Sequence, residues 1–184
     1  MSDYRIAVIV GSLRRDSINR RLAHALARLA PADFRFHTPR LDNLPFYNQD
    51  DDASPSDVVT AFRADIAGSQ GLLFVTPEYN RSLPGVLKNA LDIASRPYGK
   101  GVWAGKPAGI VSASVGAGGG AMAQQHLRNV LAFLDAPTLA QPEAFLQVRD
   151  GFFTEAGDIA NADTRQFLEN WMTRYSAWVR KHAP

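Results

Sequence analysis

Runs of consecutive apolar residues alternate along the chain with segments in which apolar residues recur every three or four positions. The runs contain many β-branched residues, which is typical of strands buried on both faces of a sheet. They are residues 6–10, 71–76 and 108–111. Two further strands are predicted at 34–36, between two prolines, and within 144–148.

Each predicted strand is followed by a segment with the apolar spacing of an amphipathic helix. The five apolar faces are formed by Ile18, Leu22, Leu26 and Leu29; by Val58, Phe62 and Ile66; by Val86, Leu87, Ala90, Leu91 and Ala94; by Leu127, Val130, Leu131 and Leu134; and by Phe167, Trp171, Tyr175 and Trp178. Pro84 is predicted at the first position of the third helix. We interpret the aromatic stripe of the last helix as core rather than as a cofactor site.

Regular alternation of strands and helices predicts an α/β fold, a doubly wound parallel sheet with helices on both faces. Right-handed crossovers between five strands favour the order 2-1-3-4-5. Ligands of such sheets bind beyond the carboxyl ends of the strands, near the point where the strand order reverses. The loops at 11–19, 77–83 and 112–120 leave these ends and are rich in polar residues or glycine. The sequence therefore predicts a ligand site where the three loops meet.

The first of these loops, residues 11–19, is suited to an anion. A helix N-terminus offers unpaired N–H groups and the positive end of a dipole, and together these bind phosphate. Ser12, Ser17 and Asn19 supply neutral donors, while Arg14 and Arg15 bring positive charge, and an arginine can hold a phosphate with two hydrogen bonds. The loop lacks the second glycine of the dinucleotide fingerprint, and the chain contains no Walker motif. An ordinary capped helix start is the alternative interpretation.

The other two loops favour a flat aromatic group attached to that phosphate. The Tyr79 ring can lie beside such a group, and the glycines within 116–120 allow the backbone to approach closely. A simple connection in which Ser82 caps the next helix remains an alternative for the second loop. A signalling receiver domain is excluded, because Val10, Gly11 and Ser12 stand where acidic metal ligands are required.

Composition restricts the classes of function. With 184 residues, of which 46% are hydrophobic and 21% charged, we expect one globular domain over residues 1–184. A formal net charge of +2 is too small to indicate nucleic-acid binding. No stretch of about 18 apolar residues predicts a membrane span. The first strand begins so close to Met1 that we expect no signal peptide. The chain has no cysteine, which excludes disulfides and thiol chemistry and fits a cytoplasmic protein.

No metal site is expected. The acidic run at 50–52 lacks the regular spacing of a calcium loop, and such runs are usually solvated. His24, His37, His126 and His182 do not have the spacing of metal ligands. The acidic run lies in a connection, 41–56, that is long enough to suggest a function or a partner contact.

Two motifs carry a resemblance to a known family. They are Gly-Ser-Leu-Arg-x-x-Ser-x-Asn at 11–19 and Pro-Glu-Tyr-Asn-x-Ser-x-Pro-Gly at 77–85, each directly after a predicted strand. With them the chain resembles the NAD(P)H-dependent FMN reductases, most closely their quinone and chromate reductase branch. Residues 87–92, 104–107 and 125–128 match as well. The resemblance implies a flavodoxin-like three-layer sandwich, bound FMN, NADPH or NADH as co-substrate, and a homodimer or homotetramer with the flavin near a subunit interface.

The resemblance also implies roles for individual residues. The phosphate would be held by Ser12, Arg14, Ser17, the N–H of Ile18, and Asn19. The isoalloxazine would be lined by Pro77, Glu78, Tyr79 and Asn80 and approached by Ser112, Ser114 and Gly118, although the glycines at 116–120 can be aligned in more than one way. No catalytic residue is implied, because the flavin carries the hydride chemistry in ping-pong order. For Glu78 we favour a structural role over that of a general acid.

The sequence does not name the electron acceptor: quinones, free flavins, azo dyes and chromate all suit an open flavin face. A flavodoxin-type electron carrier is the main alternative function, although flavodoxins are usually strongly acidic and this chain is not. A regulatory module without turnover is a second alternative, since a fold alone does not decide a function. Arg15 and Arg81 are expected to flank the pocket, and Phe46, Tyr47 and Tyr98 to contact a partner subunit.

Overall fold

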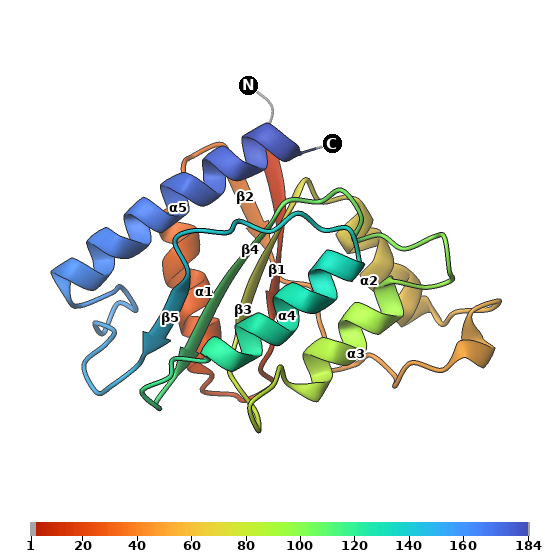
Figure 1. Ribbon diagram of the computed structural model, residues 1–184, viewed down its shortest axis with the longest axis horizontal. Helices are drawn as coiled ribbons and strands as arrows, with labels where there is room; N and C mark the ends of the chain where they lie inside the picture. Colours follow the sequence, from red (N-terminus) through yellow and green to blue (C-terminus); the bar gives the residue numbers. More distant parts are fainter. Residues whose placement is uncertain (1–2, 184) are drawn as a thin grey trace.

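Five parallel strands form one sheet in the order β2-β1-β3-β4-β5, as the sequence predicts (Figure 1). The computed structural model describes residues 3–183. The strands are β1 (Tyr4–Val10), β2 (Phe34–His37), β3 (Gly71–Thr76), β4 (Ala108–Ser114) and β5 (Ala144–Gln147). All of the neighbouring pairs are parallel, so the carboxyl ends of the strands lie at one edge of the sheet.

Helices cover both faces of this sheet, which makes the expected three-layer sandwich (Figure 1). One face is covered by α1 (Ile18–Arg28) and α5 (Ala162–His182), and the other by α2 (Asp57–Ala67), α3 (Gly85–Ala94) and α4 (Ala121–Phe133). A hydrophobic core lies on each face of the sheet, and successive residues of β1 point to the two cores alternately. Val8 packs toward α1 and α5, whereas Ile9 packs toward α2, α3 and α4. Burial on both faces explains why the central strands are continuously apolar.

Some boundaries differ slightly from those predicted. Pro84 is the N-cap of α3 and not its first helical residue, so the helix begins one position later. Residues 50 and 51 of the acidic run belong to a short 3-10 helix, η1 (Gln49–Asp51), which the Asn48 side chain caps by accepting a hydrogen bond from the Asp50 N–H.

In the described part of the chain, no helix combines the length and the apolarity needed to cross a bilayer.

Two contacts fix helices closely against the sheet. A Cβ atom on Gly109 of β4 would lie 2.6 Å from a carbon of the Tyr175 ring, so only glycine lets α5 approach this far. The buried Tyr175 hydroxyl donates to the Leu72 carbonyl at 2.9 Å. On the opposite face, the Lys106 ammonium donates to the carbonyls of Ala67 (3.0 Å) and Ser69 (2.6 Å), just where α2 ends.

Candidate functional site

A pocket of about 170 Å³ lies where the loops after β1, β3 and β4 meet at the carboxyl edge of the sheet. Its lining residues are Ser12, Arg14, Ser17, Ile18, Asn19, Pro77, Glu78, Tyr79, Ala113, Ser114 and Val115. The structure therefore brings together all of the predicted site residues except Asn80, Ser112 and Gly118. Of the lining residues, Ala113 and Val115 carry no polar side chain and were not predicted from the sequence.

One side of this pocket is the N-terminus of α1. Ser17 is the N-cap, and its hydroxyl accepts a hydrogen bond from the Arg20 N–H at 3.2 Å. Ile18 and Asn19 lie in the first turn, where a helix has no backbone acceptor for their N–H groups. The exposed Arg14 guanidinium forms no ion pair with any residue between 3 and 183. These groups are hydrogen-bond donors or a positive charge, and they suit a phosphate.

The Asn19 side chain connects this helix to the sheet and leaves one atom unpaired. Its Nδ2 donates to the carbonyl of Ala113 at the end of β4, at 3.0 Å. Its Oδ1 is buried and has no hydrogen-bond partner among the described residues. A buried acceptor without a donor costs about 1–3 kcal/mol. A ligand hydroxyl beside the phosphate would remove this cost, so the donors together with this acceptor fit the phosphate and sugar-alcohol chain of FMN.

The second loop contains a tight turn without glycine. Tyr79 and Ser82 exchange backbone hydrogen bonds of 2.9 and 3.0 Å, and the two residues between them have positive φ angles, 51° at Asn80 and 65° at Arg81. This geometry is that of a type I′ turn, in which non-glycine residues are strained. The turn keeps Tyr79 at the pocket and places Asn80 outside its lining.

Glu78 connects the second loop to α4. Its Oε2 accepts hydrogen bonds from the N–H groups of Met122 (3.0 Å) and Ala123 (3.2 Å), which belong to the first turn of that helix. A carboxylate at this position satisfies unpaired donors and interacts favourably with the helix dipole. The carboxylate is thus engaged as a helix cap, which is a structural role of the kind favoured for Glu78.

The third loop differs from the expectation at Ser112. This side chain is fully buried; its hydroxyl donates to the Gly119 carbonyl at 2.7 Å and accepts from Gln124 Nε2 at 3.1 Å. Ser112 therefore holds the third loop in place through its hydrogen bond to the Gly119 carbonyl, while Ser114 lines the pocket. Gln124 was not predicted from the sequence. It also donates to the carbonyl of Ala144, so that one buried side chain connects α4 with β4 and β5.

Several side chains near the pocket have positions that the sequence did not settle. Arg15 and Arg81, which were expected to flank the pocket, are not among its lining residues, and the Arg81 guanidinium instead lies 3.7 Å from the Met122 sulfur. His126 Nδ1 lies 2.9 Å from the Ser82 hydroxyl, a pair that had not been predicted. Among residues 3–183, no group of three or more His, Cys, Asp or Glu side chains could hold a metal ion.

Comparison with known proteins decides the family. Residues 4–149 match the model of the NADPH-dependent FMN reductases. The chain belongs to this family. It is 54% identical over 176 residues to a 2-hydroxy-1,4-benzoquinone reductase of Burkholderia sp., covering 96% of both chains, and 46% identical over 178 residues to a quinone reductase of Pseudomonas putida, covering 96% of this chain and 95% of that protein.

A solved structure agrees with this assignment. The flavoenzyme NAD(P)H:(acceptor) oxidoreductase FerB from Paracoccus denitrificans superposes with a TM-score of 0.95 at 38% identity, covering 98% of this chain and all of that one. The resemblance inferred from the two motifs is therefore confirmed, as is the flavodoxin-like fold. This member of the family is an oxidoreductase, with FMN as cofactor and NAD(P)H as co-substrate.

Proposed function

We propose that this enzyme transfers electrons from NAD(P)H to quinones and holds FMN with its phosphate at the N-terminus of α1. The observation that carries the phosphate assignment is the donor set in the pocket of about 170 Å³. The Arg14 guanidinium has no ion pair in residues 3–183, and Ile18 and Asn19, whose N–H groups have no acceptor within the helix, line the same pocket. When bound, FMN supplies the hydride chemistry.

The chain's own residues then bind and orient the cofactor. Ser12, Arg14, Ser17, Ile18 and Asn19 hold the phosphate and the adjoining hydroxyls, and Pro77, Glu78, Tyr79 and Ser114 line the ring. Asn80 and Ser112 do not contact the cofactor directly in this proposal but hold the loops that do. Asn80 forms part of the strained turn after Tyr79, and Ser112 holds the third loop through its hydrogen bond to the Gly119 carbonyl. Gly118 belongs to that third loop, and its contact with the flavin stays a prediction. No side chain is assigned an acid–base role.

The acceptor is proposed from the relatives. Two of them are named for quinone reduction, one specifically for 2-hydroxy-1,4-benzoquinone, and they cover almost the whole chain. In the proposed ping-pong order, NAD(P)H and the acceptor use the same open face of the flavin in turn. Free flavins, azo compounds and chromate are further acceptors included in the proposal. The single domain over residues 1–184 and the cytoplasmic location stay predictions.

A homodimer or homotetramer is part of the same proposal. Of the three residues expected at a partner contact, Phe46 and Tyr98 expose 89% and 87% of their surface, whereas Tyr47 is half-buried and packs against the core. Phe133 adds a further apolar side chain that is 85% exposed, and such surface supports a subunit contact. Light scattering on the purified FMN-loaded protein measures the state directly. A monomer at micromolar concentration would contradict this part of the proposal.

An anaerobic visible spectrum tests the proposed reaction. One equivalent of NADPH is expected to bleach the flavin bands, and a benzoquinone added afterwards is expected to restore them. Bands that NADPH and NADH leave unchanged would instead favour the electron carrier or the regulatory module. A colourless protein that takes up no added FMN would contradict the proposal as a whole.

A further inference from the structure

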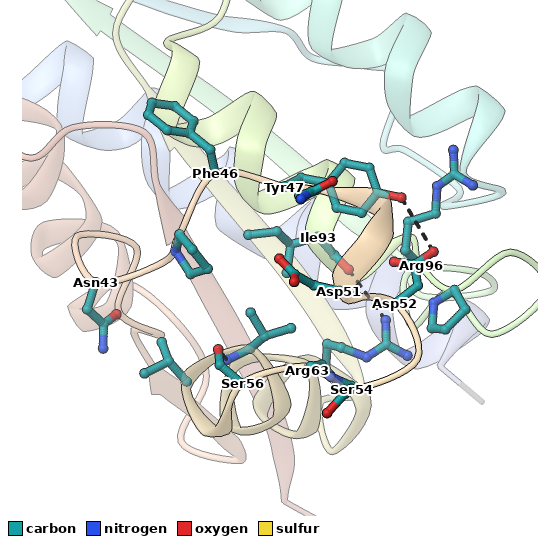
Figure 2. Close-up of a pocket in the computed structure, with 16 residues that line it drawn as sticks. Asn43, Phe46, Tyr47, Asp51, Asp52, Ser54, Ser56, Arg63, Ile93 and Arg96 are labelled. Carbon is teal, nitrogen blue, oxygen red and sulfur yellow. Dashed lines mark hydrogen bonds between the residues drawn. The ribbon is translucent and has the colours of Figure 1, made fainter.

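A second pocket, of about 360 Å³, lies beneath the long loop 41–56 and against α2 and α3 (Figure 2). It shares no lining residue with the flavin pocket. Much of its wall is apolar and is contributed by Pro45, Phe46, Tyr47, Pro55, Val58, Val59, Ile93 and Pro97. Its volume lies in the range of small-molecule sites, which are mostly apolar with a few polar groups.

The loop over this pocket is held in place by its backbone. Asn89 on α3 accepts the Tyr47 N–H through Oδ1 and donates to the Pro45 carbonyl through Nδ2, each at 2.8 Å. The Tyr47 hydroxyl donates to Asp52 at 3.4 Å. These hydrogen bonds hold the loop over the pocket, so a bound molecule need not order it.

Two arginines that line the pocket already interact with other groups of the protein, whereas the Asp51 carboxylate does not. Arg63 donates to the Lys100 carbonyl at 2.7 Å, and burial lowers its pKa. The Arg96 guanidinium lies over the Tyr47 ring, 5.7 Å from its centre. The Asp51 side chain, in contrast, has no ion pair or hydrogen bond with any residue in the described part of the chain, and Figure 2 shows it directed into the space between the loop and α2.

We propose that this pocket binds a small planar aromatic molecule carrying a protonated amine. The Tyr47 ring and the prolines and valines of the wall pack against an aromatic ring. The ammonium group forms an ion pair with the Asp51 carboxylate, which has no charged partner among residues 3–183. Phe46 stands at the edge of the pocket, and its ring points outward from the loop (Figure 2).

Three probes of matched shape and different charge test the proposal on the FMN-loaded full chain: tyramine, 4-ethylphenol and 4-hydroxyphenylacetate. Methyl NMR follows Val58, Val59 and Ile93, which line the pocket from α2 and α3. Tyramine is expected to shift these resonances and to bind about fivefold more tightly than 4-ethylphenol, the size of effect expected from one accessible ion pair. The carboxylate probe is expected to bind most weakly.

Two neighbouring carboxylates provide a matched control. Asp51→Asn is expected to reduce tyramine binding to the level of 4-ethylphenol. Asp50→Asn changes the adjacent carboxylate, which does not line the pocket, and is expected to keep the preference. Val58→Phe fills the pocket and is expected to abolish binding of all three probes.

Four results would overturn the proposal. The first is an absence of methyl shifts with every probe. The second is a preference for tyramine that survives Asp51→Asn. The third is a change in flavin absorbance without a shift at the pocket, which would place the probe on the flavin. The fourth is a set of pocket resonances that respond to protein dilution and not to tyramine, which would assign the pocket to a second copy of the chain.

Discussion

Replacing Arg14 with alanine is expected to weaken FMN binding at least tenfold. Arg14 lines the pocket at the start of α1, and its guanidinium has no other ion pair within residues 3–183. A hydrogen bond to a charged group contributes about 1.5–3 kcal/mol, which corresponds to a roughly 10- to 150-fold change in Kd. Because the side chain is exposed, solvent screening places the effect near the lower limit.

The assay is a fluorescence titration of the apoprotein with FMN and, separately, with riboflavin, which lacks the phosphate. Arg14→Ala should raise the Kd for FMN and leave that for riboflavin within about twofold, because only the phosphate is lost as a partner. The difference between wild type and variant should shrink at high salt, where charges on the surface are screened.

Arg15→Ala is the matched control, since Arg15 is adjacent, exposed and outside the pocket lining. It should leave both dissociation constants nearly unchanged. The reasoning would be refuted by an unchanged FMN affinity in Arg14→Ala, or by an equal loss for FMN and riboflavin. The first result would remove Arg14 from the phosphate site, and the second would indicate a general distortion of the loop.

Three predictions concern stability. Gly109→Ala should lower the free energy of unfolding by about 1–3 kcal/mol in urea titration, because its Cβ would overlap the Tyr175 ring; an unchanged midpoint would contradict the close packing of α5. Lys106→Met should also lower the free energy of unfolding by about 1–3 kcal/mol, because the carbonyls of Ala67 and Ser69 lose their hydrogen-bond donor. A higher thermal midpoint in this variant would contradict the stabilising role of Lys106. Burial and the charge of Arg5 lower the pKa of His37 below 6.5, so the unfolded chain binds more protons between the two pKa values. Stability therefore falls as pH decreases through this window, and His37→Gln should reduce that fall between pH 7.5 and pH 5 in parallel urea titrations.

The sheet could be predicted because its central strands are buried on both faces. A strand such as β3 (Gly71–Thr76) has no solvent side, so its sequence is a continuous apolar run bounded by polar residues. The strand order then follows from the handedness of the crossovers. The exact start of a helix does not follow from the pattern alone: Pro84 is the N-cap of α3 and not its first residue, because proline is accepted at both positions.

The site could be predicted only in part, because three-dimensional packing decides what local pattern does not. Ser112 and Ser114 are two residues apart on the same strand, yet α4 buries the first, while the second reaches the pocket. Gln124 bonds to the carbonyl of Ala144, which lies 20 residues later, and no local signal marks that contact. The turn at Asn80 contains no glycine, so its positive φ angle could not be expected from composition.

The way in which Asn89 holds the long loop also bears on how the loop can change during evolution. Both of its hydrogen bonds end on main-chain atoms, the N–H of Tyr47 and the carbonyl of Pro45. Neither bond depends on which side chain stands at these loop positions. Substitutions at exposed positions such as Phe46 or Asp51 therefore preserve the anchor, and one asparagine on a helix allows the second pocket to acquire new ligand preferences while the loop keeps its path.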